Sequence, residues 1–243
     1  MTPKPKLLAA LLLLVVVPTF AACSKKAAST VFSDNAAAQV AEAAAACDAA
    51  RIDALLKGGV NPNAIGERGT SLLQWAMLNQ CKAGFESLLA AGADPGHADE
   101  TGDTVMLYAA KADDPEYLDI LLAHKIDPNA PNTVTGRTPL MYALFGGRDE
   151  QFHKLLAGGA DPNLADPFGD TPLHVAAAIN DFGHALDLLK AGADPTARNK
   201  HGDTFQRLLY VTPTKILSAE AMRQREAVLS WLRDHNVPVE GGP

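Results

Sequence analysis

The chain has 243 residues, of which 47% are hydrophobic, and its 28 acidic against 21 basic side chains leave a net charge of −7. This balance argues against nucleic-acid binding, which depends on clustered Lys and Arg. The acidic excess is mild, and a contribution to solubility alone would also explain it. A chain of this length forms one or two ordinary domains or a single repeat array.

The first residues, 1–22, predict a signal peptide for export. Two basic residues, Lys4 and Lys6, precede an uninterrupted apolar run from Leu7 to Val17, and small residues follow it. The run is much shorter than the ~20 apolar residues that a membrane-spanning helix needs. We therefore expect this segment to be removed, and we expect no transmembrane helix elsewhere.

The expected cleavage region, Phe20-Ala21-Ala22-Cys23, resembles a bacterial lipoprotein signal. This resemblance implies that Cys23 is acylated, becomes the first mature residue and anchors the chain on the periplasmic side of the envelope. Ser24, in place of an aspartate, implies the outer membrane. Ordinary secretion with Cys23 unmodified is the alternative. Residues 23–35 contain small residues and little apolar periodicity, which predicts a flexible tether.

Three residue types recur with one period along the rest of the chain. The spacing of the Leu-Leu pairs is 33, 33, 34 and 33 residues, and prolines and glycines keep the same phase. The residues in phase are Leu55/Leu56, Leu88/Leu89, Leu121/Leu122, Leu155/Leu156 and Leu188/Leu189, then Pro62, Pro95, Pro128, Pro162 and Pro195, and Gly69, Gly102, Gly136, Gly169 and Gly202. Internal repetition at this length indicates a solenoid of stacked units.

The clearest unit extends from Asp166 to Pro195. Thr171-Pro172 predicts the start of a helix, because the threonine hydroxyl can cap it and proline lacks only an N–H that would be unpaired. After a break at 181–183, a second helix carries Leu188-Leu189 on one face and ends at Gly192. Each unit is therefore predicted to be a helix, a turn, a second helix and a hairpin loop.

The residues of this unit resemble the ankyrin repeat, whose motif is Thr-Pro-Leu-His followed one residue later by Ala. Thr171 to His174 with Ala176 match it completely, and Thr138 to Met141 with Ala143 match it except at the histidine. Residues 71–74 and 104–107 keep only its hydrophobic frame. The resemblance implies an all-α ankyrin-repeat solenoid over residues 36–240.

The phase of the repeat divides this domain into six units. These are an N-terminal partial repeat at 36–64, full repeats at 65–98, 99–130, 131–164 and 165–197, and a C-terminal capping repeat at 198–240. Leu189 and Leu232 are separated by ten residues more than the period, which places an insertion at 211–223. This insertion is either a separate lobe or a longer cap helix.

Cys47 and Cys81 are a candidate disulfide. They occupy nearly the same position in neighbouring units, and export would place them in an oxidising compartment. However, packed helices lie 8–10 Å apart, whereas a disulfide requires Cα atoms about 4.4–6.8 Å apart, so the loop ends would have to lean together. Two buried free thiols are the alternative.

The sequence provides no candidate for catalysis, a cofactor or a metal. None of its seven histidines forms a metal-ligand spacing with Cys, Asp or another His, and no phosphate-binding or hydrolase motif occurs. By the ankyrin resemblance, His174 has a structural role, bonding between adjacent repeats. We therefore expect a protein that is not an enzyme.

The ankyrin resemblance also implies where a partner binds, namely at the hairpin tips and the exposed end of the first helix of each unit. Carried over by position, the candidate partner-binding residues are Glu67, Arg68, Leu78, Glu100, Asp103, Lys111, Val134, Arg137, Phe145, Phe168, Asp170, Ile179, Lys200 and His201. Phe145, Phe168 and Arg137 are the first choices, because aromatic and Arg anchors dominate interface energies. The alternative is that each aromatic ring packs against its neighbouring hairpin.

Together these inferences predict a lipid-anchored, periplasm-facing protein that binds another protein, with no nucleic acid and no membrane contact beyond its anchor. We expect a monomer before binding. The leading hypothesis is an inhibitor or immunity protein that neutralises a toxic periplasmic enzyme, such as a lipase or wall hydrolase delivered by a type VI secretion system. The alternative is an accessory scaffold for a resident periplasmic enzyme, for example one in oxidative-stress defence.

Overall fold

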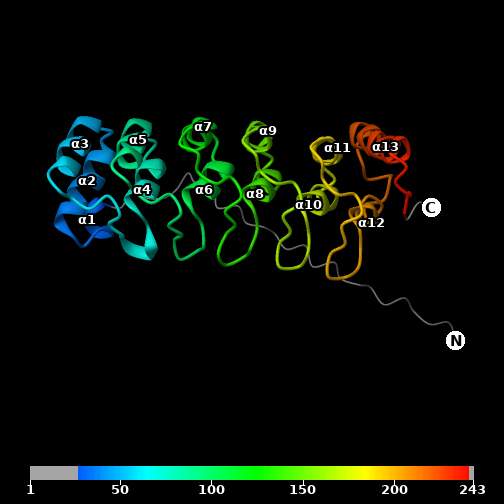
Figure 1. The fold of residues 1–243 in the computed structure, drawn as a ribbon, viewed down its shortest axis with the longest axis horizontal. Coiled ribbons are helices and arrows are strands. Elements are labelled where there is room, and N and C mark those ends of the chain that lie inside the picture. The colour runs from blue at the N-terminus through cyan, green and yellow to red at the C-terminus, as the bar shows by residue number, and fades with distance from the viewer. Residues whose placement is uncertain (1–26, 241–243) are drawn as a thin grey trace.

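The computed structural model describes residues 27–240, which form a single row of stacked helix pairs (Figure 1). The second helices of the units make one row and the first helices a parallel row nearer to the hairpin loops, which all project from the same side. The helices are α1 Ala28–Val31, α2 Asn35–Ala45, α3 Ala49–Lys57, α4 Leu72–Leu78, α5 Lys82–Ala90, α6 Val105–Lys111, α7 Glu116–Ala123, α8 Pro139–Gly146, α9 Asp149–Ala157, α10 Pro172–Ala178, α11 Phe182–Lys190, α12 Phe205–Leu208 and α13 Ala219–Asp234, with a 3-10 turn at Glu67–Gly69. The predicted all-α solenoid is confirmed.

A serine or threonine stands just before the first helix of each unit from α4 onward. The Ser71 hydroxyl accepts from the backbone N–H of Gln74, while the Gln74 side chain accepts from the backbone N–H of Ser71. The Thr138 hydroxyl caps α8 by accepting from the backbone N–H of Met141, and Pro139 follows at the first helical position. Because such caps fix where each helix starts, successive first helices lie in register.

The apolar core is continuous through the stack. In the leucine pairs of α5, α7 and α9, the first leucine is fully buried, whereas the second is only partly buried. The fully buried ones are Leu88, Leu121 and Leu155. No unit covers its own apolar face, so burial of these side chains depends on the neighbouring units.

Buried polar side chains also join adjacent units. His174 Nε2 lies 3.1 Å from the carbonyl oxygen of Asp203, and Gln74 Nε2 donates to the carbonyl of Asp103 over 2.8 Å. On the other side of the ring, the Thr171 hydroxyl lies 2.9 Å from His174 Nδ1. These contacts place the base of each hairpin against the preceding helix, as the ankyrin resemblance implied for His174.

The N-terminal end of the described chain corrects the predicted tether at 23–35. Residues from Ala28 onward are folded, because α1 and Phe32 cover the apolar face of the first unit, and Phe32 is only 2% exposed. The centres of the Phe32 and Trp75 rings are 5.9 Å apart in an edge-to-face arrangement, and Trp75 Nε1 donates to the carbonyl of Ala41. The first unit of a solenoid needs such a cover over its outer apolar face. The covering segment lies outside the repeat and has no periodic pattern, so the repeat period could not predict it.

The predicted signal peptide at 1–22 and the predicted lipidation site, Cys23, lie outside the described residues. Among residues 27–240, none of the helices is both long enough and apolar enough to cross a bilayer.

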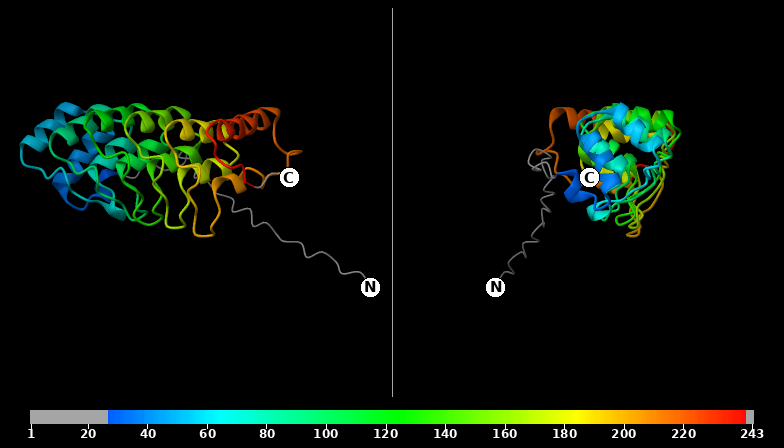
Figure 2. Two further views of the ribbon diagram at one scale, coloured as in Figure 1. Left: turned by 45° about the vertical axis from the view of Figure 1, so that its right-hand side comes forward. Right: turned by 90° about the vertical axis from the view of Figure 1, so that its left-hand side faces the viewer.

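The C-terminal insertion at 211–223 divides between a loop and a longer cap helix. Its first part is irregular, and its last residues belong to the first turns of α13. The loop and α13 close the C-terminal end of the stack (Figure 2). Val228 and Leu232 of this helix are fully buried, and the Arg225 guanidinium donates to the carbonyl of Leu209 and so holds the loop. Within the described chain, the insertion thus lengthens the cap rather than forming a separate lobe.

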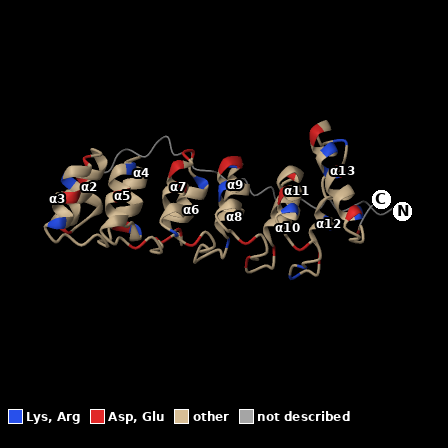
Figure 3. Cartoon of the chain, turned by 45° about the horizontal axis from the view of Figure 1, so that its top comes forward, with Lys and Arg blue, Asp and Glu red and all other residues tan. Residues whose placement is uncertain are grey.

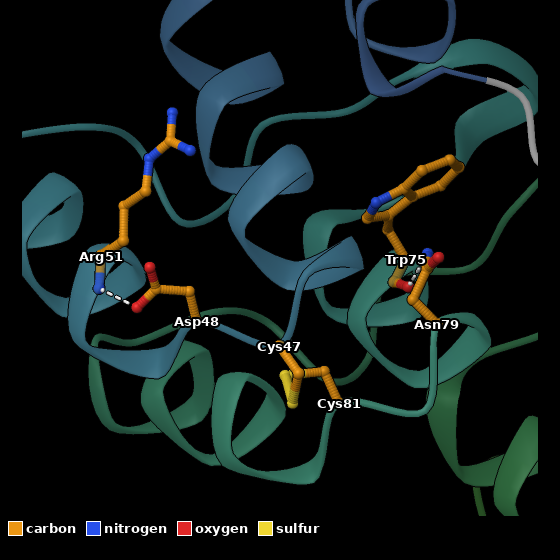
Figure 4. The surroundings of a disulfide bond; sticks show 6 residues. All are labelled: Cys47, Asp48, Arg51, Trp75, Asn79 and Cys81. Carbon is orange, nitrogen blue, oxygen red and sulfur yellow. Dashed lines mark hydrogen bonds between the residues drawn. A yellow bond between two sulfur atoms is a disulfide. The ribbon is translucent and has the colours of Figure 1, made fainter.

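The structure joins Cys47 and Cys81 in a disulfide (Figure 4). Cys47 follows α2 and Cys81 precedes α5, so both lie in the short turns between the two helices of adjacent units. Their Cα atoms are 5.0 Å apart, within the range that a disulfide spans. The turns therefore approach more closely than the helix axes do, as pairing requires.

Candidate protein-binding surface

Four of the predicted partner-binding residues meet in one cavity of about 290 Å³, between α8, α10 and the hairpins beneath them. They are Arg137, Phe145, Asp170 and His201. The other residues that line the cavity are Asp166, His174, Val175, Ala178, Asn199, Asp203 and Leu208. Equivalent positions of neighbouring units thus form one concave site.

Arg137 is held in place over the rim of this cavity. Its guanidinium carbon lies 4.7 Å from the centre of the Phe145 ring, a cation–π contact. Its Nε is 3.9 Å from an oxygen of the buried Asp166 carboxylate. The other Asp166 oxygen accepts the backbone N–H groups of Phe168 and Asp170. The same carboxylate therefore shapes the hairpin and orients the arginine.

Four large apolar side chains of the same two repeats are exposed. Val134 is 70% exposed, Phe168 61%, Phe145 44% and Ile179 38%. The Phe168 ring is therefore not covered by a neighbouring hairpin, and the Phe145 ring, which lines the cavity, is covered only in part. Exposed large apolar side chains beside a cavity are candidates for contact with a partner.

A second cavity of about 240 Å³ contains Leu78 and Lys111, together with Tyr108, Tyr117 and Arg148. The Lys111 ammonium lies 4.9 Å from the centres of both the Tyr108 and the Tyr142 rings. Burial and the hydrogen bond to Asp99 raise the pKa of Tyr108, so this phenol stays neutral. The cavity offers an aromatic wall and two cations that are paired within the protein, Lys111 with Asp103 and Arg148 with Asp113.

Asp103 does not belong to this exposed surface, contrary to its selection as a partner-binding residue. It is only 7% exposed. One carboxylate oxygen pairs with Lys111 Nζ at 2.5 Å, and the other accepts from Asn132 Nδ2 at 2.8 Å. Its charge is therefore compensated inside the protein, and Lys111 is correspondingly less available to a partner.

The remaining predicted residues lie at the hairpin tips. Glu67 is exposed, and Arg68 pairs with Glu100 at 4.0 Å, both largely in solvent, where such a pair contributes little. The backbone N–H of Lys200 donates to the carbonyl of Phe168, which links adjacent tips. The hairpins that carry these tips all project from one side of the stack (Figure 1).

The residues missing from the prediction carry a periodic signal of their own. Asp99, Asn132, Asp166 and Asn199 recur with the repeat, and each side-chain oxygen accepts backbone N–H groups of its own hairpin. Each therefore sets the conformation of a tip. A search for phased polar residues, in addition to phased leucines, would have identified them.

A second group of polar side chains lies on the opposite, outer row. Asp149 and His153 of α9 and His184 of α11 each place one potential metal-ligand atom within 4.8 Å of the others. The prediction of no metal spacing missed this cluster because it joins two repeats. Asp149 and His153 are four residues apart on one helix, and this spacing in the sequence could have indicated the cluster. Acidic residues gather at the start of α9 (Figure 3).

Comparisons with known proteins agree with this architecture. Family models described as "Ankyrin repeats (3 copies)" and "Ankyrin repeat" match residues 73–166 and 168–200. Protein PhlB of Serratia liquefaciens is 46% identical over 115 residues, covering 47% of this chain and 51% of PhlB. Neurogenic locus notch homolog protein 1 of Mus musculus is 30% identical over 152 residues, covering 63% of this chain and 6% of that protein. The chain thus spans about half the length of PhlB and a small part of the notch protein.

Two solved structures have the same fold. The ankyrin repeat domain of Bcl-3 superposes with a TM-score of 0.68 at 22% identity, covering 77% of this chain and 81% of the domain. The ankyrin repeat protein EF0377 gives a TM-score of 0.66 at 21% identity, covering 79% and 96%. At these identities the likeness concerns the fold.

Proposed function

The chain belongs to the ankyrin-repeat family, whose repeats bind proteins, and on that premise we propose that it inhibits a periplasmic enzyme by occluding it. The observation that carries the proposal is the cavity rimmed by Arg137 and Phe145, beside the exposed Phe168. Arginine and large aromatic side chains are the residues that anchor most interfaces. Here they surround a concave site that a protruding segment of another protein could enter.

The charges of this cavity favour a particular kind of segment. Three carboxylates, those of Asp166, Asp170 and Asp203, line it beside a single guanidinium. Asp170 accepts from Asn199 and Asp203 pairs with Arg207, so part of this charge is already compensated. The excess still favours a partner loop that brings a basic side chain flanked by apolar ones.

The proposed location rests on two independent features. The N-terminal segment has the pattern of a lipoprotein signal ending at Cys23, and the Cys47–Cys81 disulfide suits an oxidising compartment. We propose that the chain is held by its lipid on the periplasmic side of the outer membrane. A tethered inhibitor is present at high effective concentration where a toxic lipase or wall hydrolase would act.

Alanine at both Phe145 and Phe168 is predicted to weaken partner capture at least 10-fold, because truncating two anchor residues typically costs about 2 kcal/mol or more. Both rings are exposed, so the free energy of unfolding should change by less than about 0.5 kcal/mol per site. Co-purification from solubilised envelopes, followed by a binding titration with the captured protein, measures the first effect, and thermal melts the second.

A matched control uses exposed apolar residues outside the cavity. Val211 and Ile216 are 67% and 68% exposed in the loop before α13, and their double alanine variant should capture as much partner as the wild type. The proposed surface would be contradicted if the two double variants lost the same amount of captured partner. A melting temperature lowered only in the phenylalanine variant would contradict it as well.

The inhibitory role needs its own experiment. Cells lacking this protein should become sensitive to toxin-delivering siblings, and the wild-type gene, but not the Phe145/Phe168 variant, should restore resistance. If deletion leaves resistance unchanged while a resident enzyme co-purifies and loses activity, the chain is an accessory scaffold instead.

A further inference from the structure

We propose that Asp149, His153 and His184 form a binding site for one Zn²⁺ ion that links the repeats at 131–164 and 165–197 on the outer row. The ligands would come from α9 and α11, which belong to successive repeats. Imidazole nitrogens and a carboxylate oxygen are ligands typical of zinc, which prefers four of them in a tetrahedron. The site shares no residue with the cavity that Arg137 and Phe145 line.

Both imidazoles are oriented by hydrogen bonds that leave Nε2 as the ligand atom. His184 Nδ1 lies 2.6 Å from a carboxylate oxygen of Asp181, and His153 Nδ1 lies 2.8 Å from the carbonyl oxygen of Asp149. When each Nδ1 carries the proton, Nε2 presents its lone pair. A carboxylate behind a histidine is the usual outer partner of a zinc ligand, and Asp181 occupies that place.

One potential ligand atom of each of the three side chains lies within 4.8 Å of those of the other two. Within this group, His184 Nε2 is 2.9 Å from Asp149 Oδ1. Ligands about 2.0–2.1 Å from a tetrahedral zinc are separated from one another by about 3.3 Å. The three side chains would therefore have to draw closer around the ion, and a water molecule would supply the fourth ligand.

The surroundings favour entry and retention of the ion. Side-chain exposure is 77% for Asp149 and 50% for His153, so an ion reaches the site from solvent, whereas His184 is only 13% exposed. The Phe152 ring lies 4.2 Å from the His184 ring and forms an apolar wall. Binding of Zn²⁺ at His184 Nε2 requires that this nitrogen carry no proton, so the affinity should fall at low pH.

The test is a calorimetric titration of the full chain with Zn²⁺ alone, in oxidised protein that carries no histidine tag and has Cys23→Ser so that no free thiol contributes. We expect one ion per chain and a higher melting temperature with Zn²⁺. His153→Gln and His184→Gln should abolish this binding, and Asp181→Asn should weaken it 10- to 100-fold through the orientation of His184. His124→Gln, which changes an exposed histidine outside the cluster, is the matched control.

Three results would overturn the proposal. One is wild-type protein that binds no Zn²⁺, and a second is binding that survives His153→Gln, an exposed substitution that leaves the fold intact. The third is a doubling of mass in sedimentation when Zn²⁺ is added, abolished by the same variants, because the ion would then join two molecules rather than two repeats. None of these outcomes bears on the proposed partner site.

Discussion

Leu155→Ala will destabilise the protein by about 2–5 kcal/mol, whereas Leu156→Ala will cost roughly 1 kcal/mol. Leu155 is fully buried between successive units, and its truncation leaves a cavity that the surrounding helices cannot close. Leu156 is only partly buried and loses fewer contacts. Urea unfolding followed by circular dichroism measures both differences, with the second variant serving as the control for the first.

This contrast also distinguishes a stacked array from independent helix pairs. In a solenoid each unit is stabilised by its neighbours, so the cavity at Leu155 should loosen the units on both sides of α9. Hydrogen exchange should therefore speed up in α7 and α11 as well as in α9. Equal stabilities of the two variants, or faster exchange confined to α9, would argue against shared packing between the units.

The sequence alone predicts the stack well, but it does not say which member of each leucine pair carries the burial. Period and phase identify the pairs, because both leucines lie on one helical face. Their separate burial depends on the angle between helices of adjacent units. Leu122 shows the difficulty, since its side chain is only partly buried and packs near Gly158 of the following unit. Contacts between units are set by tertiary packing and not by the pattern of one unit.

The candidate surface could be predicted only in part for a similar reason. Arg137, Phe145, Asp170 and His201 were each selected by position in the repeat, and the structure brings them to one cavity because three successive units meet there. Asp103 occupies the same position as Asp170, and an asparagine of the next hairpin binds each carboxylate. Asp103 also pairs with Lys111 of the following helix, whereas Ala178 stands at that position after Asp170. A positional rule cannot distinguish the two aspartates without this neighbouring side chain.

The cluster on the outer row was missed because its members are far apart in the sequence. His184 and Asp149 are separated by 35 positions, and neither forms a short metal-binding motif. They meet because successive second helices lie side by side at nearly the same height (Figure 1). In a repeat protein, ligand spacings therefore have to be sought at one repeat period as well as within one helix.

Removing the Cys47–Cys81 disulfide is the second change with a large expected effect. The bond joins residues separated by 34 positions, and closing a loop of that length restricts the unfolded chain enough to stabilise the fold by roughly 3–4 kcal/mol. The double variant Cys47→Ala/Cys81→Ala should lose about this amount. Alanine is suited to the test because Cys81 is fully buried, where a serine hydroxyl would need a partner.

The loss should be concentrated at the N-terminal end of the stack, because the bond encloses α3 and α4 and fastens the first unit to the second. That unit has a neighbour on one side only and the short cover of α1 on the other, so it depends most on the crosslink. Hydrogen exchange should rise in α2 and α3 and remain unchanged in α11. Dithiothreitol should reproduce the effect in the wild type and do nothing further to the double variant. Identical unfolding midpoints for oxidised and reduced protein would mean that packing alone holds the first unit, and the disulfide would then no longer support an oxidising location.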